Sequence, residues 1–186
     1  MPQWVSALLA MGVGLTVGVV GGKYFIYRNG AQIGNAITIN NTHVNYSVNN
    51  IVKSGNAKLW GLSPFKRGDE IDDLLGNNVG HNFPTYDKFD PLTGEAVSVK
   101  SLNTVSKTYQ TQAGLYNRLK GYVDSLGNFK GGWTASKRWI APRDIKSQTL
   151  EIAIPDRPLT PAQIAALDQL KKDFGGTVKI VITVVR

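Results

Sequence analysis

Two short apolar runs separated by a turn carry residues whose types fit the hydrolysis of a phosphodiester. In the sequence FPTYDKFDPLTGEAVSVKSLN, Asp87 lies in the first run, and Ser98 and Lys100 lie in the second. Side chains alternate along a strand, so Ser98 and Lys100 share one face, whereas Glu95 points to the other face. A hairpin would place Asp87 beside Ser98 and Lys100. We therefore expect an acid, a hydroxyl and a lysine to lie together.

A second carboxylate, Glu70, lies upstream in a segment that predicts a short helix beginning at Asp69 and ending at Gly76. If this helix crosses the ends of the strands, Glu70 and Asp87 supply the oxygen ligands that a hard divalent cation takes. Lys100 beside them would orient or deprotonate a water and stabilise charge on the phosphorus. The chain has no cysteine and two histidines, so we expect Mg²⁺, Mn²⁺ or Zn²⁺ bound mainly through oxygen.

Each of these residues also has an ordinary structural interpretation. An acid in the first helical turn, as expected for Glu70, often only complements the helix dipole. Asp87 has the alternative of an exposed turn acid, and Lys100 that of a lysine reaching to solvent from a sheet edge.

The segment from residue 63 to 186 has the pattern of one α/β domain with a three-layer core, a mixed central sheet flanked by helices. Helical and strand periodicities alternate along it, and the final apolar run predicts a strand buried on both faces. After the first helix, the expected elements are strands at 83–89 and 95–102, a helix at 108–126, a strand at 148–155, a helix at 159–176 and a strand at 177–186.

Residues 1–62 differ in composition, because all 13 acidic residues lie between Asp69 and Asp173. Residues 4–22 carry no charge and are long enough to cross a bilayer as a helix, although their five glycines weaken that interpretation. A buried glycine-rich packing element and a signal peptide are the alternatives. Asn29-Gly30 predicts a hairpin. We expect residues 1–62 to serve membrane entry or attachment, and residues 63–186 to keep catalysis alone.

The net charge of +8 favours a polyanionic partner. Basic residues alternate with aromatic residues in the middle of the second segment, which suits phosphate contact and base stacking. The alternative is a solvated basic face over core tyrosines. The loop GNFKGGWTASKRW is the best single candidate for substrate contact. The candidate nucleic-acid contacts are Lys107, Arg118, Lys120, Trp133, Lys137 and Arg138.

The motif YDKFD followed by SVKS resembles the PD-(D/E)xK nuclease core, with Glu70 as the acid of its first helix. The ordered set GDEIDDLLGNN, NFPTYDKFD and AVSVKSLN, with a later TY, resembles more closely the restriction-endonuclease-like toxins at the C-termini of contact-dependent growth inhibition effectors (CdiA). This resemblance covers residues 63–186. One departure is Ser98, which stands where the family pattern has its second acid, and this favours a single, loosely held metal.

The resemblance implies a secreted or cell-surface effector fragment that acts in the cytoplasm of a target cell as a metal-dependent endonuclease. Its substrate would be tRNA first and DNA second, and a cognate immunity protein would neutralise it. Two other functions fit the sequence: a nucleic-acid-binding module without catalysis, and a small membrane-anchored interaction protein.

Overall fold

The computed structural model describes residues 15–20, 23–28, 31–32, 37–38 and 49–186, which fall into two compact units. The N-terminal unit contains a small antiparallel sheet, in which strand β2 pairs with each of the other three strands. Its strands are β1 (Leu15–Val20), β2 (Lys23–Arg28), β3 (Ala31–Gln32) and β4 (Ile37–Thr38).

Two expectations for this unit can be compared with its described part. The hairpin predicted at Asn29-Gly30 is confirmed, because Arg28 pairs with Ala31 across an antiparallel connection. The described part of the apolar run, Leu15–Val20, is a β-strand, so a membrane-spanning helix is the wrong prediction there. Within the described residues, no helix has the length and apolar character needed to cross a membrane. The rest of the run, residues 4–14 and 21–22, lies outside the described residues.

The C-terminal unit is built on a five-stranded mixed sheet in the order β5-β11-β10-β7-β6, in which only β6 is antiparallel to its neighbour. Its strands are β5 (Asn50–Val52), β6 (Lys88–Phe89), β7 (Glu95–Ser101), β10 (Ser147–Pro155) and β11 (Lys179–Val185). Smaller elements are the 3₁₀ turns η1 (Leu59–Gly61), η2 (Lys107–Tyr109) and η3 (Pro142–Asp144), and the two-stranded hairpin of β8 (Gly132–Trp133) and β9 (Trp139–Ile140).

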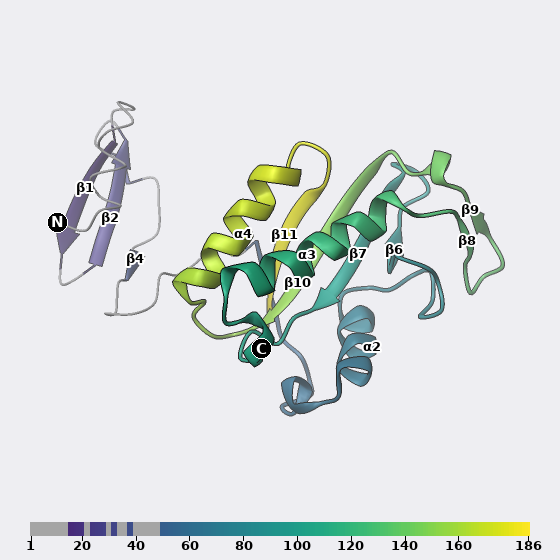
Figure 1. Ribbon diagram of the computed structural model, residues 1–186, viewed down its shortest axis with the longest axis horizontal. Helices are drawn as coiled ribbons and strands as arrows, with labels where there is room; N and C mark the ends of the chain where they lie inside the picture. Colours follow the sequence, from purple (N-terminus) through teal and green to yellow (C-terminus); the bar gives the residue numbers. More distant parts are fainter. Residues whose placement is uncertain (1–14, 21–22, 29–30, 33–36, 39–48) are drawn as a thin grey trace. The chain divides into compact units, whose positions relative to one another are not determined.

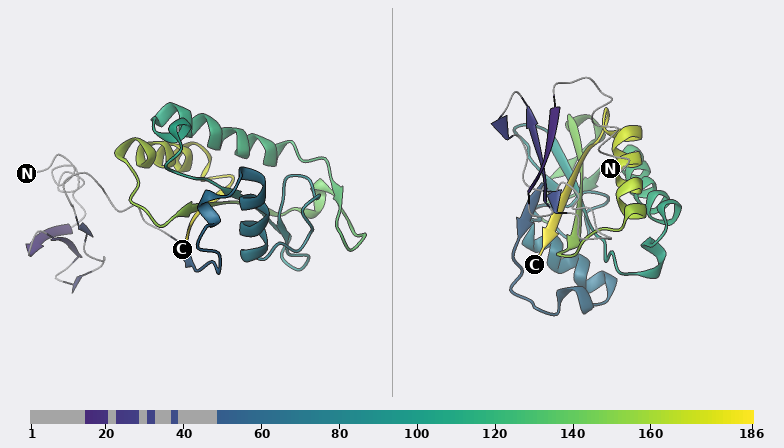
Figure 2. Two further views of the ribbon diagram at one scale, coloured as in Figure 1. Left: turned by 90° about the horizontal axis from the view of Figure 1, so that it is seen from below. Right: turned by 90° about the vertical axis from the view of Figure 1, so that its left-hand side faces the viewer.

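Helices cover both faces of this sheet (Figure 1). Parallel neighbours need crossover connections, and the helices α3 (Gln112–Gly127) and α4 (Pro161–Phe174) supply them from β7 to β10 and from β10 to β11. Both crossovers progress in the same direction across the sheet, so both helices lie on one face. In the left view of Figure 2, α3 and α4 lie above the sheet, and α2 (Pro64–Leu74) lies below it. The expected three-layer α/β core is confirmed.

The central strand β10 is buried on both sides, as its apolar sequence requires. Leu150, Ile152 and Ile154 alternate with Ala153, which belongs to the cluster under α2. That cluster also contains Ile71 of α2. The sheet is therefore fixed from both faces, which gives the strand ends a rigid position.

Helix α2 begins five residues earlier than the sequence predicts. Its N-cap is Ser63 and its first residue is Pro64, so the expectation of a start at Asp69 is wrong. Proline suits the first helical position, where its missing N–H would have no helical partner. Glu70 is consequently a mid-helix residue. With Ile71 at the centre of the buried face, the residues on either side of it point about 100° away in opposite directions.

Candidate active site

Asp87 stands at the start of the edge strand β6, and the neighbouring strand holds its carboxylate. The Asp87 N–H donates to the Val97 carbonyl at 2.9 Å, and Asp87 Oδ2 accepts the Val99 N–H at 2.7 Å. The side chain thus takes the place of a strand carbonyl beside β7, just before β6 begins. No hydrogen bond within the described part of the chain uses Asp87 Oδ1, which leaves this oxygen for a ligand.

Lys100 meets Asp87 at this edge, as the strand alternation predicts. Its Nζ lies 3.3 Å from Asp87 Oδ2 and donates to the Val99 carbonyl at 2.6 Å. The side chain is 29% exposed, so the ammonium is fixed yet remains in reach of a ligand. Glu95, on the opposite strand face, accepts a hydrogen bond from Thr149 instead.

Ser98 lies beneath this pair. Its side chain is buried, and its hydroxyl donates to the Thr85 carbonyl at 2.6 Å. Thr85 has a φ of 73°, a left-handed conformation that is costly for a β-branched residue. Together with Pro84, this conformation explains why residues 83–87 are not the strand that the sequence predicts. Ser98 therefore holds the segment that positions Asp87, rather than reaching a ligand itself.

The helix acid that lies near Asp87 is Asp72, not Glu70. Glu70 is exposed on α2, and its carboxylate accepts a hydrogen bond from Asn56 Nδ2 at 2.8 Å. Burial, followed by the negative charge of Asp87, raises the pKa of Asp72 to about 7, while the charge of Lys100 opposes the shift. The sequence signal could not separate the two acids, because Glu70 and Asp72 flank the buried Ile71 on opposite sides of the helix.

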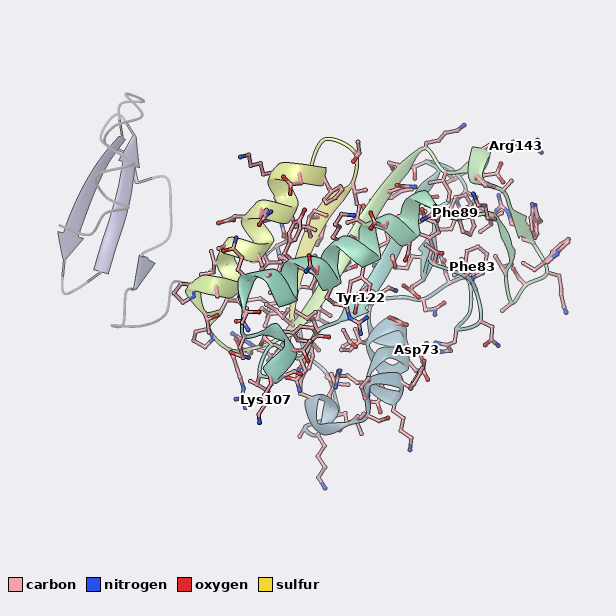
Figure 3. The ribbon with its side chains drawn as sticks, in the orientation of Figure 1. Asp73, Phe83, Phe89, Lys107, Tyr122 and Arg143 are labelled. Carbon is pink, nitrogen blue, oxygen red and sulfur yellow. The ribbon has the colours of Figure 1, made fainter. Side chains whose placement is uncertain are left out.

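An open cleft of about 600 Å³ joins Asp72 and Lys100 to the aromatic end of α3. From α2 it is lined by Phe65, Arg67, Asp69 and Asp72, from β7 by Val99, Lys100 and Ser101, and from η2 and α3 by Tyr109, Arg118 and Tyr122. In Figure 3, Tyr122 lies between α3 and α2, with Asp73 of α2 on one side and Lys107 of η2 on the other.

Of the predicted nucleic-acid contacts, Arg118 is the one that lines this cleft. Lys120 faces away from it in an ion pair with Asp124, one helical turn later, at 2.7 Å. Lys107 is exposed in η2, and Arg138 lies with its guanidinium 5.6 Å from the ring centre of Phe89.

The hairpin of β8 and β9 lies on the side of the C-terminal unit away from α4 (Figure 1). A second cavity, of about 630 Å³, lies against this hairpin. Trp133 and Lys137 line it together with His81 and Phe83. The loop that the sequence favours for substrate contact therefore belongs to this cavity and not to the cleft at Lys100.

The donor set in the cleft fits a small, hard cation. Asp72 lines the cleft together with Lys100, which pairs with Asp87, and in the described residues no group of three or more acidic or histidine side chains is placed to hold a metal. Magnesium and manganese sites commonly use one or two carboxylates and complete their coordination with water and substrate phosphate. Zinc usually takes three or more protein ligands, so it fits less well.

Known proteins resemble the C-terminal unit. Residues 67–184 match the family described as the CDI toxin restriction endonuclease-like domain. Deoxyribonuclease CdiA-o11 of Escherichia coli O157:H7 (strain EC869) is 31% identical over 108 residues, which are 52% of this chain and 27% of the relative. Deoxyribonuclease CdiA of Yersinia pseudotuberculosis serotype O:3 (strain YPIII) is 33% identical over 103 residues, 47% of this chain and 9% of the relative.

A solved structure, the CdiA-CT/CdiI toxin and immunity complex from Yersinia pseudotuberculosis, aligns with a TM-score of 0.53 at 27% identity. The alignment covers 62% of this chain and 98% of that chain. The chain thus spans less than a third of its curated relatives, but nearly all of this solved structure. Because the family match covers most of the chain and agrees with the resemblance noted in its motifs, the chain belongs to the CDI toxin restriction endonuclease-like domain family.

Proposed function

We propose that this chain is a divalent-metal-dependent deoxyribonuclease toxin whose active site is the cleft at the edge of β7. The observation that carries the proposal is that Lys100 pairs with Asp87 at the end of the sheet and lines one cleft with Asp72. The two curated relatives are named deoxyribonucleases, which favours DNA over the tRNA that the sequence alone placed first.

Asp72 and Asp87 would hold the cation, Asp87 through its free Oδ1. A bound divalent cation supplies positive charge that polarises the scissile phosphate and acidifies the attacking water. Lys100 places a fixed ammonium beside the same phosphate and stabilises the charge that develops on it. Ser98 contributes indirectly, because its hydroxyl holds the Thr85 segment and so the position of Asp87.

The biological setting of the family supports a partner as well as a substrate. The solved structural neighbour is a complex of a toxin with its immunity protein. By extension, a cognate immunity protein binds this chain, and the toxin acts in the cytoplasm of a target cell after delivery. The N-terminal unit would then serve delivery, whereas the described residues 49–62 belong to the C-terminal unit.

Cleavage of nucleic acid by the purified chain tests this proposal. Plasmid DNA and total tRNA are incubated with the chain in Mg²⁺, in Mn²⁺ and in excess EDTA. We expect cleavage of DNA with either metal and none in EDTA. Asp87→Asn and Lys100→Met should each lower the rate by about 10²- to 10³-fold. Glu95→Gln, on the other strand face, is the matched control and should retain the wild-type rate.

Two outcomes would overturn this assignment. Wild-type rates in Asp87→Asn and Lys100→Met would remove the cleft as the active site. Cleavage of tRNA in preference to DNA would replace the substrate.

A further inference from the structure

Arg67 is a buried cation without a counter-ion in the described part of the chain. The residue is 8% exposed, and its Nη1 donates to the Leu62 carbonyl at 3.1 Å. Its guanidinium lies 5.7 Å from the ring centre of Trp60, and its Nε has no hydrogen-bond partner. No described carboxylate lies within ion-pair distance of it. Burying an unpaired charge is costly, so Arg67 needs a reason beyond folding.

Arg118 approaches the same end of the cleft from α3. Its guanidinium lies 5.4 Å from the ring centre of Tyr122, and a hydrogen bond with Tyr109 raises the pKa of Arg118. It, too, has no carboxylate partner within the residues that the structure describes. Burial raises the pKa of Tyr122, whereas the charges of Arg118 and Arg67 oppose this shift. Arg67, Arg118 and Tyr122 all line the same cleft, so both guanidinium groups lie at the end of the cleft that holds this tyrosine.

The cleft thus has two electrostatic halves. The charges that act on Asp72 are those of Asp87, Lys100, His81 and Asp69. In that half, Lys100 pairs with Asp87, and His81 lies 3.8 Å from Asp69. The positive charge of this half is opposed by its own acids, whereas the two arginines around Tyr122 face no acid among the described side chains.

We propose that Arg67 and Arg118, with the hydroxyls of Tyr109 and Tyr122, form a second phosphate subsite, which binds a phosphodiester next to the scissile one. The inference rests on the proposed function and extends it. Guanidinium groups bind phosphate oxygens through paired, charge-assisted hydrogen bonds, and a phosphate supplies the anion that both arginines lack. The subsite holds the strand so that the next phosphate lies at Asp87 and Lys100.

A subsite that only holds the strand should change binding more than chemistry. We expect Arg67→Met and Arg118→Met each to raise the KM for a duplex of defined sequence roughly 10- to 100-fold, with little change in kcat. Each should also reduce the slope of log Kd against log salt by about one. Lys172→Met, which removes an exposed charge on α4, is the control and should change neither KM nor kcat.

Stability separates this role from a structural one. If Arg67 is retained for the substrate, Arg67→Met should have a Tm equal to or above that of the wild type, because it removes a buried unpaired charge. If Arg67 instead holds the fold, its Tm should fall together with its activity. Arg118→Met decides the question if Arg67→Met does not fold, because Arg118 is exposed.

Duplexes with one neutral methylphosphonate at each position around the cleavage site locate the subsite. Their affinities are measured in the slow-cleaving background of Lys100→Met and in the double variant Lys100→Met/Arg118→Met. We expect neutralisation of one flanking phosphate to weaken binding by the first variant and to have no further effect on the second. The proposal is overturned if both arginine variants keep the wild-type KM, or if the effect falls on the scissile phosphate alone. Absence of any DNA cleavage by the wild type would instead overturn the proposed function.

Discussion

The cleft at Lys100 and the cavity at the β8–β9 hairpin are nearly equal in volume, about 600 and 630 Å³, but differ in chemistry. The cleft brings acids and cations from α2, β7 and α3 to one sheet edge. The hairpin cavity is lined mainly by apolar and small residues, with Lys137 and His81 as its charged or titratable groups. Size alone therefore does not identify an active site, whereas converging charges on rigid elements do.

The hairpin cavity differs from the cleft in having exposed aromatic side chains beside it. Trp133 is 64% exposed, and its ring centre lies 5.4 Å from that of Trp139. Such rings suit stacking on bases, as the sequence predicts, but no acid of the hydrolytic set lies with them. We expect the cleft to determine the rate and the hairpin to contribute to affinity.

Truncation should separate the two regions most strongly. Leu59 is buried under α2, and Trp60 donates to the Val185 carbonyl at 3.0 Å, so residues before Ser63 support the cleft and not the hairpin. A chain that begins at Ser47 should keep the cleavage rate. A chain that begins at Ser63 should lose both its cooperative thermal transition and its cleavage. Full activity of the shorter chain would show that β5 and η1 are dispensable.

Exchange of the helix acids should give the next largest effect. Asp72→Asn removes a carboxylate that lines the cleft with Lys100, so we expect cleavage to fall by about 10²- to 10³-fold. Glu70→Gln alters a carboxylate bound only to Asn56 and should leave the rate within about threefold of the wild type, since it is outside the cleft. Single-turnover experiments measure the cleavage rate of both variants. Equal losses of rate would contradict the assignment of Asp72, and not Glu70, to the cleft.

Substitution of the hairpin aromatic should have a smaller effect, on binding only. Trp133→Ala removes one exposed stacking surface, which is worth about 1–3 kcal/mol per base in single-stranded complexes. We expect the KM for DNA to rise about tenfold or less, with kcat unchanged. A fall in kcat as large as that expected for Lys100→Met would contradict the account, because it would show that the hairpin cavity also determines the rate.

The smallest effect concerns pH. The folded pKa of Asp72, about 7, is above its ordinary value of 3.8, so between these values the metal-free folded protein retains a proton that the unfolded chain has lost. The free energy of unfolding therefore falls as the pH rises through this window. In EDTA, the wild-type Tm should fall by more than that of Asp72→Asn between pH 5 and pH 8. Asp168→Asn, an exposed acid on α4, is the control and should follow the wild type.

The sequence predicts those parts of the site that depend on strand alternation. Ser98 and Lys100 do lie on the strand face opposite Glu95, and Asp87 does meet Lys100, because a two-residue period leaves little freedom in register. The three-layer core also follows from the alternation of helical and strand patterns, which requires crossover helices between parallel strands.

The sequence does not predict the parts that depend on the phase of a helix or on contacts between distant segments. Glu70 and Asp72 lie about 100° on either side of the buried Ile71, so the helical pattern alone does not show which of the two acids faces the cleft. The approach of Arg67 to the Tyr122 end of the cleft joins two helices from opposite faces of the sheet. No local sequence pattern predicts that these two helices approach each other.

The central claim is that Asp87 and Asp72 hold the cation at the edge of β7. A measurement of metal binding tests this claim most directly. Isothermal titration with Mn²⁺ compares the wild type with Asp87→Asn, Asp72→Asn and Glu70→Gln, each checked for folding by circular dichroism. The account predicts that Glu70→Gln binds Mn²⁺ as the wild type does, and that the two aspartate variants lose most of this affinity. Retained binding in Asp72→Asn with loss of binding in Glu70→Gln would contradict it.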